Sequence, residues 1–252
     1  MAYYRQCLEG NVIVKLFILL CLFVTNSYAA SLYVAVAANF LEPAQRLAQR
    51  YESLQNDKIT LIPGSSGKLA AQILQGAPFD IFFSADVATL DKLGDAVLVD
   101  SRFVYATGKL VLWTPDLDAG WDILTSTEIT RIAIANPKTA PYGQAAQQAL
   151  RSVDLQDRLA DKIILGENIT QAYQFTQTGN AQAAFIALSQ IPPSNNLSSQ
   201  FWLIPQTAYE PIQQVASITA QSANVAAAQA FLSFVRSEEG RAIIEYYGYE
   251  TP

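Results

Sequence analysis

Hydrophobic and polar positions follow two alternating periods along most of the chain, which predicts repeated strand–helix units. Short apolar runs bounded by Gly, Pro, Asn or Asp predict buried strands, whereas apolar residues recurring every three or four positions predict helices. The expected strands are 32–36, 59–62, 79–83, 109–113, 131–135, 163–165, 183–188, 201–204 and 215–219. The expected helices are 40–54, one that begins at 65–67 and ends before Gly76, 87–93, 144–153, 155–161, 169–178, 224–235 and 238–247. Strands that alternate with helices in this way indicate an α/β protein with parallel strand pairing.

The stretch Gly64-Ser65-Ser66-Gly67-Lys68 opens the second of these helices directly after a strand. The first amide N–H groups of a helix have no partner within the helix, and the positive end of the helix dipole lies there. Such a start is a ready site for an anion. The alternative interpretation is an ordinary serine cap, with glycines that serve the turn. The stretch is not a P-loop, because the first glycine of that motif is missing and Leu69 replaces its Ser or Thr.

Four strand–helix turns share this property. Asn39, Ser66, Tyr142 and Ile169 each lie at or beside the start of a helix that follows a strand. In open α/β sheets, ligands bind beyond the carboxyl ends of the strands, at such helix starts. If the four turns converge, they offer backbone N–H groups, an amide and a hydroxyl without a full positive charge. Backbone donors cannot accept a proton, so the pattern favours a small, fully ionised oxyanion over hydrogen phosphate.

The strands and helices form two successive α/β sets, and a late strand and two helices are left over after the second set. This organisation predicts two lobes joined by crossing segments, which we expect near 107–110 and 213–216. The first lobe is assigned to residues 31–108 and 216–252, and the second lobe to residues 109–215.

Residues 1–30 have the features of a cleaved secretory signal peptide. Two basic residues precede an apolar core at 16–24, and Ser27-Tyr28-Ala29 is a small-x-small cleavage site. Cleavage is expected near Ala29/Ala30, which predicts an exported protein. A membrane anchor is the alternative, and the apolar core is too short to span a bilayer.

Composition narrows the possible chemistry. The chain has no histidine, and its two cysteines, Cys7 and Cys21, both lie in the leader. The mature chain therefore lacks the commonest general base, the commonest zinc ligand and any thiol nucleophile. Without the leader, 14 basic and 21 acidic residues give a net charge of −7. An acidic surface argues against binding to nucleic acid or to anionic membranes.

A hydrolase that uses Ser66 with Lys68 remains an alternative, because carboxylate and Ser-Lys chemistry need neither histidine nor cysteine. The two residues are two apart at a helix start, however, and side chains at that spacing do not face each other. Asp80 and Asp86 are expected to cap and brace their strand–helix turn, since carboxylates beside a bound dianion would repel it.

Several segments together carry a resemblance to a known family. They are Val36-Ala37-Ala38-Asn39-Phe40, Gly64 to Leu69, Gly76-Ala77-Pro78-Phe79-Asp80 through Ser84-Ala85-Asp86, Asn136-Pro137 through Pro141-Tyr142-Gly143, Gly166-Glu167-Asn168-Ile169, Phe185 to Gln190, and Tyr246 to Tyr249. On these segments the mature chain resembles the exported molybdate-binding proteins of ABC transporters. The resemblance implies the two-lobed type II periplasmic-binding-protein fold, with a mostly parallel sheet flanked by helices in each lobe and the ligand cleft between the lobes.

The resemblance also implies roles for individual residues. Asn39 and Ser66 would bind oxyanion oxygens through their side chains and backbone N–H groups, and Tyr142 and Ile169 would donate backbone N–H groups from the second lobe. Some family members add a tyrosine hydroxyl at a position where this chain has Ala187. No catalytic residue, no cofactor and no direct protein ligand to a metal is expected.

The resemblance further implies how the protein would act. It would capture molybdate or tungstate between its lobes in the periplasm and deliver the anion to the membrane permease of an ABC transporter. We expect a monomer that binds no nucleic acid. The alternative is a protein of the same fold for sulfate or an organic acid. An organic anion would need apolar or arginine contacts, and the four turns contain no arginine.

Overall fold

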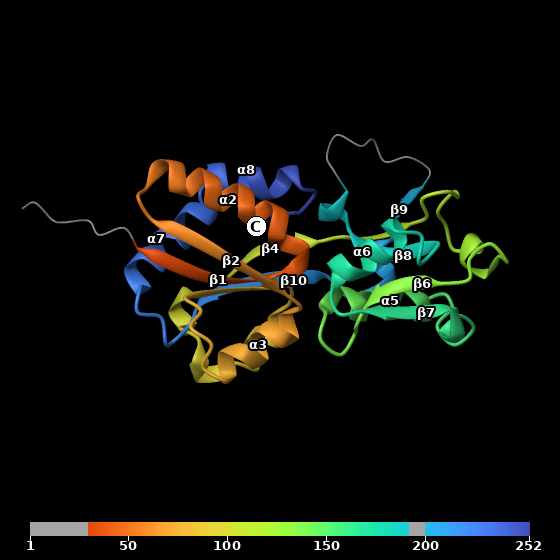
Figure 1. Cartoon of the computed structure of the whole chain (residues 1–252), viewed down its shortest axis with the longest axis horizontal. Coiled ribbons are helices and arrows are strands. Elements are labelled where there is room, and N and C mark those ends of the chain that lie inside the picture. Colours follow the sequence, from red (N-terminus) through yellow and green to blue (C-terminus); the bar gives the residue numbers. More distant parts are fainter. Residues whose placement is uncertain (1–29, 192–199) are drawn as a thin grey trace, which may run out of the picture.

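A computed structural model describes residues 30–191 and 200–252 of the chain. The expected signal peptide and its cleavage site lie outside these residues, apart from Ala30. The described chain forms two lobes side by side, each built on one five-stranded sheet (Figure 1). In the described part of the chain, no helix is long and apolar enough to cross a membrane.

The first sheet has the strand order β2-β1-β3-β10-β4. Its strands are β1 (Ser31–Ala37), β2 (Lys58–Gly64), β3 (Ile81–Ser84), β4 (Phe103–Gly108) and β10 (Ile212–Ile218). Helices α2 (Leu41–Leu54), α7 (Val225–Val235) and α8 (Glu238–Tyr246) pack on one face, and α3 (Ser66–Leu74) and α4 (Val87–Asp91) pack on the other. Alternate residues of β1 point into the two hydrophobic cores, as the period of a strand requires.

The second sheet has the order β7-β6-β8-β5-β9. Its strands are β5 (Leu110–Trp113), β6 (Ile132–Ala135), β7 (Ile163–Gly166), β8 (Ala183–Ala187) and β9 (Phe201–Leu203). Helix α5 (Pro141–Arg151) covers one face and α6 (Ile169–Gln177) covers the other. Short 3-10 helices are η1 (Ala38–Phe40), η2 (Gly94–Ala96), η3 (Val99–Ser101), η4 (Asp122–Thr125), η5 (Ala160–Lys162), η6 (Leu188–Gln190) and η7 (Gln206–Ala208).

Both sheets are mixed, with one strand that runs against the others. In the first sheet β10 is antiparallel to its neighbours β3 and β4, and in the second sheet β5 is antiparallel to β8 and β9. The other four strands of each sheet share one direction. The α/β fold with mostly parallel sheets in two lobes is therefore confirmed.

Three local predictions differ from the structure. The sequence predicts a strand at 109–113 and none before it, whereas the structure has a further strand, β4, that ends one residue before Lys109. Helix α5 begins at Pro141 and not at Gln144, since a proline is well tolerated in the first turn, where its missing N–H has no helical partner. The predicted helix 155–161 contains only the 3-10 turn η5 at its end.

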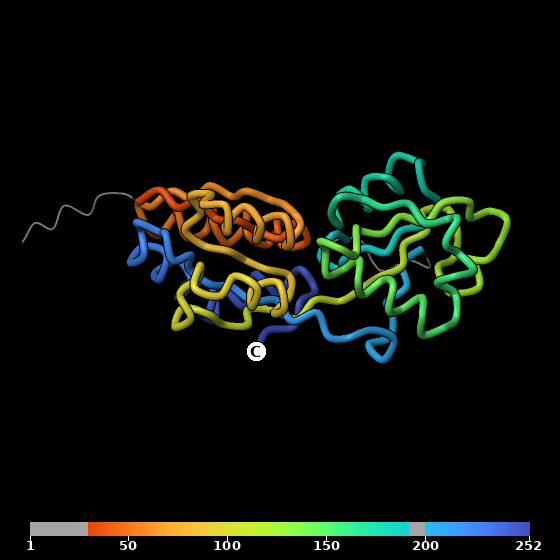
Figure 2. The backbone as a smooth tube through the Cα atoms, turned by 90° about the horizontal axis from the view of Figure 1, so that it is seen from below, coloured from red at the N-terminus to blue at the C-terminus, as the bar shows by residue number. Residues whose placement is uncertain are grey.

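Two segments cross between the lobes. One passes from β4 to β5 at Gly108–Leu110, and the other leads through Tyr209 into β10 (yellow-green and light blue in Figure 2). Residues 31–108 with 216–252, and residues 109–215, remain the proposed lobe limits. Strand β10, which spans the limit at 215/216, pairs only with strands of the first sheet.

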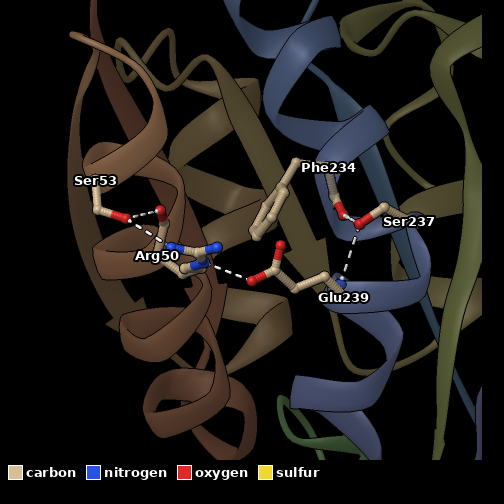
Figure 3. A network of polar contacts seen from close by, with 6 residues as sticks. Arg50, Ser53, Phe234, Ser237 and Glu239 are labelled. Carbon is tan, nitrogen blue, oxygen red and sulfur yellow. Dashed lines mark hydrogen bonds and ion pairs between the residues drawn. The ribbon is translucent and has the colours of Figure 1, made fainter.

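Helices α2 and α8 lie side by side on the outer face of the first lobe. Arg50 of α2 forms an ion pair with Glu239 of α8, and Ser237 caps α8 by accepting a hydrogen bond from the Gly240 N–H (Figure 3). Because the ion pair is exposed to solvent, its contribution to stability is about 1 kcal/mol or less. Close to it, the buried ring of Tyr51 in α2 packs edge-on against Phe231 of α7, and such an aromatic pair adds to the stability of the core.

Candidate functional site

Helix starts from both lobes meet at one small cavity in the cleft between the lobes. The cavity is small, with a volume of about 10 Å³, which is roughly the room that a single water molecule needs by this measure. Its lining residues are Ala37, Ala38, Asn39, Gly64, Ser65, Ser66, Ala85, Ala140, Pro141, Tyr142, Asn168 and Ile169. The structure thus brings together all four predicted site residues.

The start of α3 leaves one backbone donor for the cavity. The N–H groups of Lys68 and Leu69 donate to the Ser65 carbonyl, and the Gly67 N–H donates to the Thr139 carbonyl of the second lobe at 2.9 Å. These bonds leave the Ser66 N–H of the first turn for a ligand. The Ser66 Oγ accepts a hydrogen bond from the Ala85 N–H at 2.9 Å, so its own hydrogen is also available to donate.

Helix α5 provides its donor through Tyr142. Pro141 has no N–H, and the N–H groups of Gly143 and Gln144 both donate to the Ala140 carbonyl. The Tyr142 N–H is therefore the first-turn donor that these bonds leave at the cavity. Proline at the helix start and a glycine close behind it are the local features that expose this single amide.

Helix α6 provides a further helix start at the cavity. Asn168 caps it, because its side-chain oxygen accepts the Gln171 N–H at 3.0 Å and its carbonyl accepts the Ala172 N–H. The cap leaves the N–H groups of Ile169 and Thr170 without a partner inside the helix. Of these two residues, Ile169 lines the cavity.

Asn39 differs from its expected role. Its side-chain Nδ2 donates to Gln214 Oε1 and to the Tyr249 hydroxyl, each at 2.9 Å, so both amide hydrogens have partners within the protein. Asn39 lies in η1, where the first N–H groups lack a helical acceptor. A contact from its side-chain amide therefore does not fit this geometry, whereas a contact from its backbone N–H does.

A buried polar network beneath the cavity holds Asn39 and Tyr142. Gln214 is at its centre: Oε1 accepts from the Tyr105 hydroxyl at 2.8 Å, and Nε2 donates to the Tyr142 hydroxyl at 3.3 Å. Burial raises the pKa of Tyr105, Tyr142 and Tyr249 above the ordinary tyrosine value. The sequence analysis missed this network, because strands β4 and β10 contribute residues far apart in the chain and carry no motif there.

These tyrosines predict a loss of stability at alkaline pH. A raised pKa in the folded state stabilises the protein below the ordinary tyrosine pKa of 10.0, and this contribution is lost as the unfolded chain ionises above it. The melting temperature should therefore fall steadily from pH 10 upward. Calorimetry at a series of pH values measures this, with tyrosinate absorbance as the control. Ionisation of all tyrosines near pH 10 without loss of structure would contradict it.

The cavity lining contains no lysine, arginine, aspartate or glutamate. The charged residues expected nearby have partners elsewhere: Lys68 pairs with Glu167 across the lobes at 2.6 Å, and Asp86 caps α4 by accepting the Thr89 N–H. Asp80 accepts the Tyr33 N–H at 2.8 Å, as expected of a bracing residue. The cavity would therefore hold a charge through amide and hydroxyl dipoles alone.

Several contacts hold the two lobes together around the cavity. Besides the bond from Gly67 to Thr139, the Ser189 hydroxyl donates to the Asn39 carbonyl at 2.8 Å.

Ala187 supplies no hydroxyl, and its N–H donates to Gln190 Oε1. Across residues 30–191 and 200–252, no group of three or more Asp, Glu, His or Cys side chains could hold a metal ion. The arrangement suits binding of a small anion.

Two lobes, two crossing segments and a cavity lined by helix starts from both lobes define a two-lobed solute-binding protein. The sequence model of the bacterial extracellular solute-binding proteins matches residues 32–250. The chain belongs to this family.

Individual relatives agree with this assignment. The chain is 40% identical to the molybdate-binding protein ModA of Rhodobacter capsulatus over 228 residues, which covers 88% of this chain and 89% of the relative. It is 39% identical to ModA of Azotobacter vinelandii over 227 residues, which covers 88% of this chain and 90% of the relative. The solved structure of the Azotobacter vinelandii periplasmic molybdate-binding protein superposes with a TM-score of 0.84 at 38% identity, over 88% of this chain and 99% of that chain.

Proposed function

We propose that this protein captures molybdate or tungstate between its two lobes and delivers the anion to the permease of an ABC transporter. The observation that carries the proposal is the convergence of the helix starts at Asn39, Ser66, Tyr142 and Ile169 on one cavity without charged lining residues. Relatives at about 40% identity that are named molybdate-binding proteins support the choice of anion.

The donors can supply the free energy of a micromolar complex. Four backbone N–H groups and the Ser66 hydroxyl would each contribute about 1.5–3 kcal/mol as charge-assisted hydrogen bonds. Their sum of roughly 7.5–15 kcal/mol, reduced by an association cost of at least about 4 kcal/mol, reaches the roughly 8 kcal/mol of a micromolar complex when the bonds lie in the upper part of that range. The lobes close on the cavity, so entry and release require them to separate about the two crossing segments.

Other ligands fit less well. Hydrogen phosphate brings a proton donor to a site rich in donors, which costs a hydrogen bond. An organic acid would need apolar or arginine contacts, and the cavity lining contains no arginine. Sulfate is also a fully ionised tetrahedral dianion, but it is smaller than molybdate, and the named relatives favour the larger anion.

The remaining parts of the proposal follow from the same comparison. We infer a periplasmic location and no enzymatic activity, since these relatives are named as binding proteins. The monomeric state is a prediction from the family resemblance alone. A periplasmic relative at 38% identity supports the location, and the acidic net charge agrees with a soluble carrier that binds no nucleic acid.

A thermal-shift series tests the ligand. Molybdate and tungstate should each raise the melting temperature of the purified mature protein strongly, because a ligand that binds only the folded state stabilises it. Sulfate, phosphate and chromate at the same concentration should have little effect. Stabilisation by sulfate alone would favour the alternative ligand, and no response to any of the five anions would refute the proposed function.

A further inference from the structure

Ser65 has a buried hydroxyl that no interaction within the described residues explains. The residue lines the cavity and is 3% exposed, and its Oγ has no hydrogen-bond partner among the residues that the structure describes. A buried polar group without a partner lowers stability, since it gives up its hydrogen bonds to water. The folded, ligand-free protein is therefore less stable than it would be if this hydroxyl had a partner.

The usual role of such a serine is already taken by other groups. Ser65 occupies the N-cap position of α3, where a serine side chain ordinarily accepts an N–H from the next turn. Here the Gly67 N–H donates to the Thr139 carbonyl, and the Lys68 N–H donates to the Ser65 carbonyl at 3.1 Å. The Ser65 side chain makes no capping bond. The Ser65 hydroxyl is therefore left without a hydrogen-bond partner, in a residue that lines the cavity.

We propose that the Ser65 hydroxyl donates a hydrogen bond to an oxygen of the bound oxyanion. This inference rests on the proposed function. It makes the Ser65 hydroxyl a second side-chain donor of the site, beside the Ser66 hydroxyl. Two adjacent serines then divide their roles: the Ser66 hydroxyl also accepts the Ala85 N–H and thereby braces the turn after β3, whereas the Ser65 hydroxyl serves the ligand alone. The Ser65 hydroxyl is neutral, so it adds a donor without adding charge to the cavity.

The two roles that Ser65 could play have opposite consequences for a Ser65→Ala variant. If the hydroxyl serves the ligand, its removal leaves the melting temperature of the ligand-free protein unchanged or higher, because an unpartnered polar group disappears. The dissociation constant for molybdate should rise by about tenfold or more, as expected for loss of one hydrogen bond to a charged group. If the hydroxyl supports the fold, the ligand-free protein melts lower and the affinity stays the same.

Ser126→Ala is a matched control, since Ser126 Oγ is also buried without a described partner and the residue does not line the cavity. Calorimetric titration with sodium molybdate, together with ligand-free melting curves, is done on wild type and both variants. A selective loss of affinity in Ser65→Ala, with Ser126→Ala equal to wild type, supports the inference. Equal affinity of Ser65→Ala and wild type would overturn it while leaving the proposed function intact. Absence of molybdate binding by wild type would overturn both.

Discussion

A Ser66→Asp variant is expected to lose about a thousandfold or more in molybdate affinity. The new carboxylate would lie in a cavity without a lysine or arginine to compensate it. At about 4 Å and an effective dielectric constant of about 20, two like unit charges repel by roughly 4 kcal/mol. The bound anion carries two charges, so this figure is a lower estimate. Calorimetric titration of the variant against wild type measures the loss.

Ser66→Asn is the matched control for charge. Asparagine has nearly the shape of aspartate, and its side-chain oxygen can likewise accept the Ala85 N–H that Ser66 Oγ accepts now. The asparagine variant should therefore fold and retain far more affinity than the aspartate variant. Similar affinities of the two variants would show that charge does not matter at this position, which would contradict the placement of the anion beside Ser66.

A Gly143→Ala variant is expected to destabilise the protein by about 2–3 kcal/mol through overpacking, which lowers the melting temperature by roughly 4–12 °C in a chain of this size. Gly143 lies in the first turn of α5, and an added Cβ would meet the Ala135 carbonyl group, with its carbon at 2.8 Å, and the Pro137 nitrogen at 2.9 Å. These are backbone atoms at the end of β6, so the helix start itself must move. That movement displaces the Tyr142 N–H, and molybdate affinity should fall as well.

The sign of this effect distinguishes packing from helix propensity. Alanine is favoured over glycine inside a helix by about 1 kcal/mol, so propensity alone predicts a more stable protein. Gly120→Ala is the control for the substitution itself, because Gly120 lies outside the helices and an added Cβ there meets nothing within 4 Å. A Gly143→Ala variant that is as stable as Gly120→Ala and binds molybdate normally would contradict the tight approach of α5 to β6.

The sequence allowed prediction of the architecture because each strand–helix unit carries its own local signal. The apolar run of β1, the start of α3 at Ser65 and Ser66, and the cap at Asn168 are all readable from short segments. Helix starts that follow parallel strands must gather at one edge of a sheet. The convergence of Asn39 and Ser66 in one lobe therefore follows from local pattern and sheet geometry.

The remaining features depend on contacts between distant segments. The partners of the Asn39 side chain, Gln214 and Tyr249, come from β10 and from the C-terminal segment. No periodicity near Asn39 indicates these partners, and the family resemblance implies a side chain that faces the ligand. The unpartnered hydroxyl of Ser65 arises in a similar way, because the amide that it would cap bonds instead to Thr139 in the other lobe.

Amide chemical shifts on titration with molybdate measure most directly whether backbone N–H groups at the helix starts hold the anion. In ¹H–¹⁵N spectra of the labelled mature protein, the amide protons of Asn39, Ser66, Tyr142 and Ile169 should move downfield together as each N–H donates a hydrogen bond to an oxygen of the anion. The change should saturate at one molybdate per chain. Saturating binding that leaves these four amides unshifted, with shifts confined to other surfaces, would contradict the proposed site.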